Sequence, residues 1–207
     1  PVLSPDTIDS LVEALQNGDS GALDELRRMG AQHPDAVRVS RCLDAWQAGR
    51  QATTRRTGNR EHFLADVEAG RQSLDLLKHP LLPYQVDGML HLAFGERALL
   101  ADDMGLGKTV QAVAACELLR RLHGIERVLV VAPASLKAEW QEQIARFTDL
   151  TSRIVFGPRG ERLKQYRDPA FFTLANYEQI IPDGADINRV LAPDVVILDE
   201  AQRIKNW

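Results

Sequence analysis

The chain has 207 residues and a formal net charge of −4, and 44% of its residues are hydrophobic and 26% charged. These values are typical of a globular protein of one or two domains, and they exclude a uniformly basic protein that binds nucleic acid over its whole surface. The two cysteines, Cys42 and Cys116, have no partners at metal-ligand spacing, so we expect neither a disulfide framework nor a zinc site. We also expect a cytoplasmic protein without a leader peptide or a membrane partner, because no apolar run approaches ~20 residues.

Residues 1–79 are predicted to form an all-α region. Apolar residues recur at helical spacing in three short stripes, which end at glycines: Ile8 to Leu15 before Gly18, Leu23 to Met29 before Gly30, and Val39 to Trp46 before Gly49. The polar segment 49–59 has no apolar period and is predicted to be a loop, and a further helix is expected from about Phe63 to Leu77. Nothing in this region gathers catalytic groups.

The pattern changes after Pro80, and residues 80–207 are predicted to form an α/β domain. Short apolar runs alternate with helical stretches, and the runs cover 97–101, 127–133, 153–156, 171–175 and 194–199. Apolar runs without polar alternation favour a parallel sheet that is covered on both faces. Strands that alternate with helices favour a doubly wound α/β arrangement.

Within this domain, the segment "DMGLGKT", Asp103 to Thr109, has the features of a phosphate-binding loop. It follows a predicted strand and opens a helix that is expected over Lys108–His123. The first turn of that helix offers unpaired N–H groups to phosphate, and Gly105 and Gly107 allow the backbone to curl around it. Lys108 is expected to reach the β and γ phosphates, and the Thr109 hydroxyl to ligate Mg²⁺.

The loop departs from the usual pattern G-x-x-x-x-G-K-[ST], because Asp102 stands where the first glycine is expected. Taken alone, such a near match also fits an ordinary surface loop. An acidic pair downstream argues for the nucleotide site, since Asp199 and Glu200 directly follow the apolar run that begins at Val195. Asp199 is expected to hold Mg²⁺, and Glu200 to orient and deprotonate the attacking water. The alternative is a solvated acidic pair at the end of a strand.

Five segments in this order resemble the first RecA-like lobe of the Swi/Snf-type ATPases, a branch of the superfamily-two helicases. They are "LLPYQVDGMLHL", "LLADDMGLGKTVQAVA", "VLVVAPASLKAEWQ", "LANYEQI" and "VVILDEAQRIKN". The resemblance covers residues 80–207, and an aspartate at the place of Asp102 is usual in that family. It implies a P-loop RecA-like parallel sheet, truncated here and preceded by the all-α region, that binds ATP with Mg²⁺.

The resemblance also assigns roles to single residues. Gln85 matches the glutamine that reads the adenine edge, although a glutamine on a helix surface is the alternative. The loop residues Asp103, Met104 and Leu106 complete the nucleotide-binding set, and Gln202 fills the last place of the D-E-A-Q box, where it couples the site to the lobe or caps a helix. "APASLKAEW" resembles a segment that follows the DNA backbone, so the following residues are candidate DNA contacts: Ser135, Lys137, Asn176 and Tyr177. Lys137 is equally well read as a solvated lysine.

In the family, further elements follow the D-E-A-Q box, including the next strand and a second lobe with arginine fingers. We therefore expect this chain to be a fragment of an ATP-driven protein that moves along double-stranded DNA. By itself it is expected to bind nucleotide weakly at best and to hydrolyse ATP negligibly. The next strand usually inserts between the runs 97–101 and 194–199, so these runs are expected to face a gap. Water, a shifted strand or a second chain is expected to fill it, the last by strand-exchanged self-association.

Two other functions fit the same residues. One is a helicase of the same superfamily that separates RNA or DNA strands. The other is an interaction module, in which the N-terminal helices bind a protein partner and the nucleotide lobe is a passenger. An exposed apolar groove among Leu11, Leu15, Leu26 and Trp46 is the feature expected of such a module.

Overall fold

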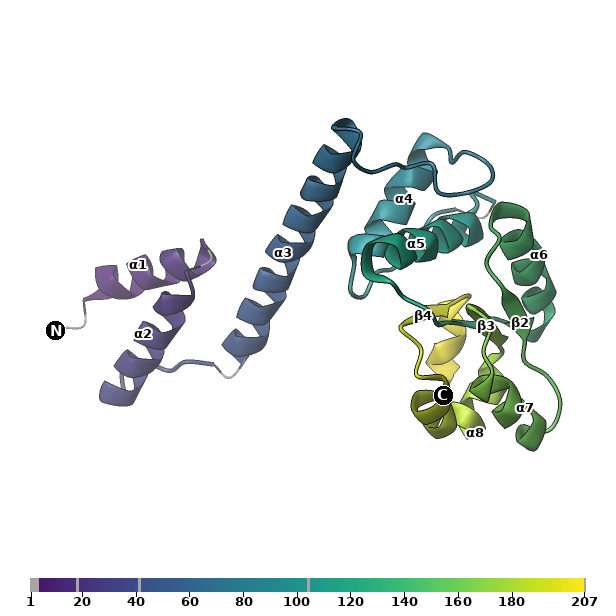
Figure 1. Ribbon diagram of the computed structural model, residues 1–207. Coiled ribbons are helices and arrows are strands. Elements are labelled where there is room, and N and C mark those ends of the chain that lie inside the picture. The colour runs from purple at the N-terminus through teal and green to yellow at the C-terminus, as the bar shows by residue number, and fades with distance from the viewer. Residues whose placement is uncertain (1–3, 18, 41, 104, 207) are drawn as a thin grey trace. The chain divides into compact units, whose positions relative to one another are not determined.

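The computed structural model describes residues 4–17, 19–40, 42–103 and 105–206 (Figure 1). The chain divides into two compact units, residues 1–65 and residues 66–207, and each is described by itself. Within the described residues, no helix is long and apolar enough to cross a membrane.

The first unit begins with two short helices, α1 (Pro5–Gln16) and α2 (Ser20–Gln32). Each starts at a side-chain cap: the Ser4 hydroxyl accepts a hydrogen bond from the Thr7 N–H, and the Asp19 carboxylate from the Gly21 N–H. The apolar stripes of both helices meet in one cluster, whose buried members are Leu15, Ala22, Leu23 and Leu26. The predicted stripes are therefore confirmed, although α2 runs past the expected end at Gly30.

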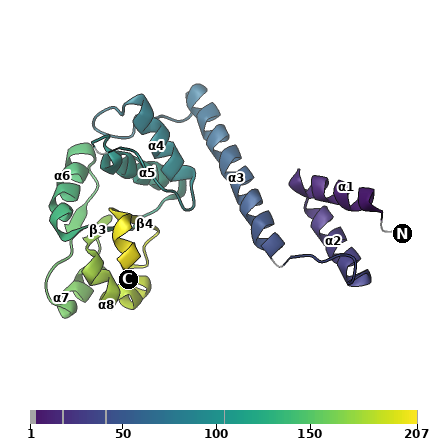
Figure 2. The same cartoon turned by 180° about the vertical axis from the view of Figure 1, so that it is seen from behind.

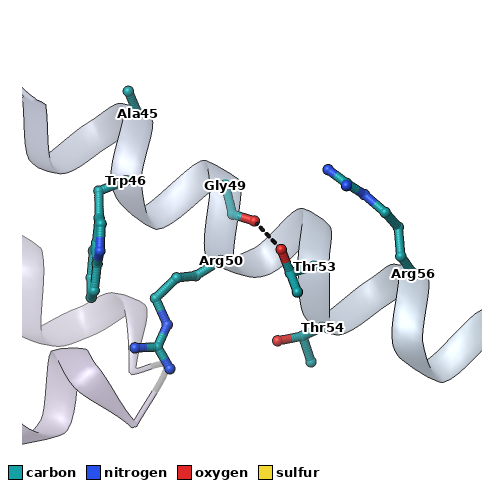
Figure 3. A pocket seen from close by; sticks show the side chains of 7 residues that line it. All are labelled: Ala45, Trp46, Gly49, Arg50, Thr53, Thr54 and Arg56. Atoms are coloured by element: carbon teal, nitrogen blue, oxygen red, sulfur yellow. Dashed lines mark hydrogen bonds between the residues drawn. The ribbon is translucent and has the colours of Figure 1, made fainter. Parts of the chain in front are cut away.

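The prediction of a loop over 49–59 is wrong, because α3 runs without a break over Cys42–Glu68. Residues 49–59 are helical although they bury no apolar stripe, and Phe63 is the one buried residue of α3. Its hydroxyls bond back to the preceding turn: Thr53 donates to the Gly49 carbonyl at 3.0 Å, which Figure 3 shows, and Thr57 to the Thr53 carbonyl at 3.1 Å. Periodicity detects helices through burial, so it does not detect an exposed one.

The helix expected to continue to Leu77 instead ends at Glu68. Gly70 adopts a positive φ of 70°, and the N–H groups of Arg71 and Gln72 both bond to the Asp66 carbonyl. This left-handed turn terminates the helix. Leu76 and Leu77 are buried although the segment that carries them is irregular.

The second unit contains two helices that pack against each other, α4 (Pro83–Phe94) and α5 (Lys108–His123), and they are neighbours in both views (Figure 1, Figure 2). The bounds of α5 agree with the prediction, since Gly107 precedes it and Gly124 ends it in the left-handed region. Glu117 on α5 is bonded to Arg120 and Arg121, and Arg121 donates to the Leu76 carbonyl, which fixes the segment before α4.

The sheet has four parallel strands in the order β2-β3-β1-β4, namely β1 (Val128–Val131), β2 (Ser152–Ile154), β3 (Phe172–Ala175) and β4 (Val195–Leu198). The connecting helices are α6 (Lys137–Phe147), α7 (Arg159–Arg167) and α8 (Tyr177–Asp186). A 3-10 helix, η1 (Ala134–Leu136), precedes α6, a π-helix, η2 (Ile187–Leu191), continues α8, and a second 3-10 helix, η3 (Ala201–Asn206), follows β4. All four residues of β1 and of β3 are buried. The predicted α/β class with a parallel sheet is confirmed.

The predicted strand over 97–101 is wrong, because this segment is irregular. Leu99 is 75% exposed, and its carbonyl bonds to the His91 ring instead of to a strand. The expected cover over both faces of the sheet also fails at β4, where Val196 and Leu198 are 51% and 46% exposed. Among the described residues, β1 is the one strand that pairs with β4, so the other edge of β4 has no partner strand there. Both departures occur at the expected gap; what fills that gap stays a prediction.

Candidate nucleotide-binding site

The predicted phosphate-binding loop leads directly into α5 with the backbone shape that such loops need. Gly105 and Gly107 have positive φ angles of 84° and 74°. At Gly107 a Cβ would lie 2.6 Å from Nε2 of Gln85, so the end of this glutamine would have to move to admit a side chain. The positive φ angles are what require glycine at both positions. Met104, which was assigned to the nucleotide, lies outside the described residues.

Lys108 opens α5 with its ammonium group turned onto the loop. Its Nζ donates to the carbonyls of Asp102 and Asp103 at 2.9 and 3.0 Å. Thr109 is half-buried in the same turn. An ammonium group, a hydroxyl and the free N–H groups of a helix start thus belong to one turn, which suits an anion with several negative charges.

Gln85 lies against this loop, although 21 residues separate it from Leu106. Its Oε1 accepts from the Leu82 N–H at 3.0 Å, and its Nε2 donates to the Leu106 carbonyl at 3.3 Å. The structure therefore brings together the loop and the glutamine that the sequence assigned to adenine. The role in adenine recognition stays a prediction.

Gln111 is a residue of this site that sequence reasoning missed. Its side chain is fully buried, and its Nε2 donates to Oδ2 of Asp102 and to the carbonyl of Leu106, both at 3.2 Å. The available signal was a glutamine among the apolar positions of α5, next to the buried Val110 and Val113. A buried amide in such a stripe requires hydrogen-bond partners.

The acidic pair follows β4, as predicted, and Asp199 is held by three contacts. Its N–H donates to the Val131 carbonyl at 2.8 Å, which continues the β1–β4 ladder. Its Oδ2 accepts from the indole N–H of Trp140 at 2.8 Å, and its carbonyl accepts from the Tyr177 hydroxyl at 2.6 Å. Trp140 of α6 therefore orients the carboxylate, and Tyr177 of α8 fixes the backbone of the same residue. That Lys108 and Asp199 approach one magnesium ion stays a prediction.

Glu200 is exposed and has a positive φ of 54°, which is uncommon for a side chain of this kind. The amide of Gln202 donates to its carboxylate, so the last residue of the D-E-A-Q segment contacts the residue assigned to the attacking water. Strained backbone of this kind concentrates at functional sites.

Lys137 was predicted to be either a DNA contact or a solvated lysine, and the structure agrees with neither. It is 9% exposed, and its Nζ donates to the Val155 carbonyl at 2.9 Å, so it is neither solvated nor presented to a DNA backbone. Burial lowers the pKa of this lysine, and nearby Glu178 partly opposes the shift. Tyr177 is likewise buried and turned toward Asp199, which corrects its assignment as a DNA contact. Ser135 is exposed.

Comparisons with known proteins agree with the family resemblance that the sequence suggested. A family model described as the SNF2-related domain matches residues 63–207. The chromatin-remodeling ATPase INO80 of Debaryomyces hansenii is 36% identical over 162 residues, which cover 70% of this chain and 12% of that protein. The human chromodomain-helicase-DNA-binding protein 8 is 27% identical over 221 residues, which cover 96% of this chain and 8% of that protein.

A solved structure has a similar fold. It is the SWI2/SNF2 ATPase core of Sulfolobus solfataricus in complex with double-stranded DNA, with a TM-score of 0.56 and 29% identity. The match covers 65% of this chain and 29% of that one. The chain thus spans a small part of the length of the proteins it resembles.

Proposed function

Because the chain belongs to the SNF2-related family, we propose that it forms the ATP-binding part of a motor that moves along double-stranded DNA. The observation that carries the proposal is the loop before α5, where Gly105 and Gly107 have left-handed backbones and Lys108 lies on the loop carbonyls. The fold supports it as well, since the similar solved structure is an ATPase core of this family bound to DNA.

The residues present fit ATP with Mg²⁺. The left-handed backbone at Gly105 and Gly107 would let N–H groups of the loop approach a phosphate, and the N-terminus of α5 favours negative charge there. Thr109 and Asp199 would hold the metal, which neutralises charge on the phosphates when bound. Lys108 would bind the terminal phosphates, Gln85 the adenine, and Glu200 would take a proton from the attacking water.

Double-stranded DNA is the proposed partner of the longer protein, and a strand-separating helicase is the second candidate. The segments "GLGKTVQA" and "DEAQRIKN" favour the translocase branch. The two functions differ in the nucleic acid that stimulates ATP hydrolysis. Greater stimulation of the longer protein by duplex than by single-stranded DNA supports the translocase, and the reverse supports the helicase.

The exposed apolar groove that the interaction-module hypothesis expects is not present among the residues named for it. Leu15 and Leu26 are buried in the cluster between α1 and α2, and Leu11 packs against it, so these residues form no exposed groove. Trp46 is 40% exposed and instead stacks with Arg50, whose guanidinium carbon lies 5.1 Å from the ring centre. Figure 3 shows this pair in a shallow hollow along α3.

Self-association through β4 is a further proposal for the isolated chain. Its exposed Val196 and Leu198 stand on a strand whose one described ladder is with β1. Exposed strand edges readily pair with other chains. Sedimentation at increasing concentration tests this, and a monomer at all concentrations contradicts it.

Binding of a fluorescent ATP analogue to the 207-residue chain in Mg²⁺ tests the site itself. Lys108→Ala should weaken binding by roughly tenfold or more, because charge-assisted hydrogen bonds to phosphate are lost. Glu200→Gln should bind as the unaltered chain does, since the glutamate is assigned to the attacking water. Lys164→Ala is the matched control, because this lysine is exposed and pairs with Glu161 on α7. Equal binding by Lys108→Ala and the control contradicts the proposal.

A further inference from the structure

Gln111 is fully buried, yet only half of its amide is satisfied. The Nε2 group has two acceptors, Asp102 Oδ2 and the Leu106 carbonyl. The Oε1 atom is buried and has no hydrogen-bond partner among the described residues. A buried carbonyl without a partner lowers stability, so an apolar side chain of the same size would suit this core position better.

The orientation of this amide follows from its neighbours. Exchanging its oxygen and nitrogen would place the oxygen against a carboxylate and a carbonyl, which are both acceptors. The space for Oε1 is provided by Gly88 on α4, where a Cβ would lie 1.7 Å from this atom. Gly88 therefore makes room for an amide oxygen that forms no hydrogen bond there.

The two acceptors lie on opposite sides of the loop's tight turn. Asp102 precedes Gly105, and Leu106 follows it. One amide nitrogen thus joins the two ends of the turn from inside the core. This contact also explains why Asp102 replaces the first glycine of the usual pattern, because a glycine has no side chain to accept the hydrogen bond.

We propose that Gln111 is a positioning residue for nucleotide binding, which holds Asp102 and Leu106 so that the loop keeps the shape that phosphate requires. The proposal rests on the proposed function, since it assumes that the loop binds ATP. It implies that the amide is retained for binding at the expense of stability. A purely structural role implies the opposite, namely that removing the amide lowers stability and leaves binding unchanged.

Gln111→Met separates the two roles, because methionine has a similar length and no amide. We expect the melting temperature to stay the same or rise, while the fluorescent ATP analogue binds about tenfold more weakly, as the loss of roughly one net hydrogen bond implies. Gln72→Met is the matched control, since Gln72 is exposed and the chemical change is the same. The control should alter neither quantity.

Unchanged binding by Gln111→Met overturns the proposal, and so does a fall in melting temperature that accompanies weaker binding. If Gln111→Met does not fold, Asp102→Ala decides, because it removes the acceptor and Asp102 is only half-buried. It should weaken binding by a similar factor, and wild-type binding by this variant overturns the proposal. Failure of the unaltered chain to bind the analogue is a different result, which refutes the proposed function instead.

Discussion

Replacing Asp183 by asparagine removes one negative charge from the interior of the second unit and leaves the volume almost unchanged. Asp183 lies on α8 and is fully buried. Its carboxylate accepts two hydrogen bonds from Arg162 of α7, at 2.6 and 2.8 Å, and one from the Tyr166 hydroxyl at 3.1 Å. The substitution leaves the guanidinium group of Arg162, which is 12% exposed, without this counter-charge.

The expected loss of stability follows from that geometry. Breaking a buried ion pair by neutralising one member costs about 3–5 kcal/mol. The asparagine oxygen can still accept one of the hydrogen bonds, so we expect a value near the lower end, about 3 kcal/mol. Arg159, at 3.6 Å from the carboxylate, is 55% exposed and adds little. Such a loss is a large share of the ~5–15 kcal/mol that stabilises a typical domain.

Urea unfolding at pH 7 measures this change, followed by tryptophan fluorescence in a Trp46→Phe background so that the signal reports the second unit. Asp168→Asn is the matched control, because Asp168 also pairs with an arginine, Arg153, but its side chain is 87% exposed. The control should lose less than about 1 kcal/mol. An equal loss in the two variants would refute the reasoning.

The same experiment has a pH dependence of defined sign. Burial by itself raises the pKa of Asp183, but the hydrogen bonds from Arg162 and Tyr166 outweigh it, so the pKa lies below its usual value. A carboxyl with a lowered pKa stabilises the fold above its unfolded pKa of about 3.9. The difference between the wild type and Asp183→Asn should therefore persist down to that pH and vanish as the pH falls through the lower, folded value.

Two further predictions concern side chains that the fold turns inward. Trp140→Phe removes the indole N–H that orients Asp199. Half-maximal binding of the fluorescent ATP analogue should therefore need a higher Mg²⁺ concentration. An unchanged Mg²⁺ requirement contradicts the orienting role. Lys137→Met should stabilise the chain at pH 7, because burial disfavours the charged amine and the Val155 carbonyl keeps a second donor in Gln179. The gain, measured by urea unfolding, should shrink as the pH rises and the lysine loses its proton, and destabilisation at pH 7 contradicts it.

Local features that the sequence contains outright were predicted correctly. The bounds of α5 follow from glycines at both ends, whose left-handed conformations begin and end the helix. Four of the five predicted strands are present because each is a continuous apolar run that a sheet core can bury. The placement of the acidic pair after β4 follows from its position directly behind such a run.

The errors arose where the outcome depends on a distant partner. The run 97–101 is as apolar as the others, but a strand exists only when another strand completes its hydrogen bonds, and the order β2-β3-β1-β4 gives it none among the described residues. The polar segment 49–59 is helical because backbone hydrogen bonds are local and need no buried face.

The sequence by itself therefore determined the family of the chain, and it located the loop and the acidic pair for which we propose phosphate and metal binding, because these are patterns of neighbouring residues. Only the tertiary structure decided how the site is supported. Gln111 spans the loop, and Trp140 and Tyr177 orient Asp199, across separations of up to 59 residues. Such contacts depend on which elements pack together, and no local pattern specifies that.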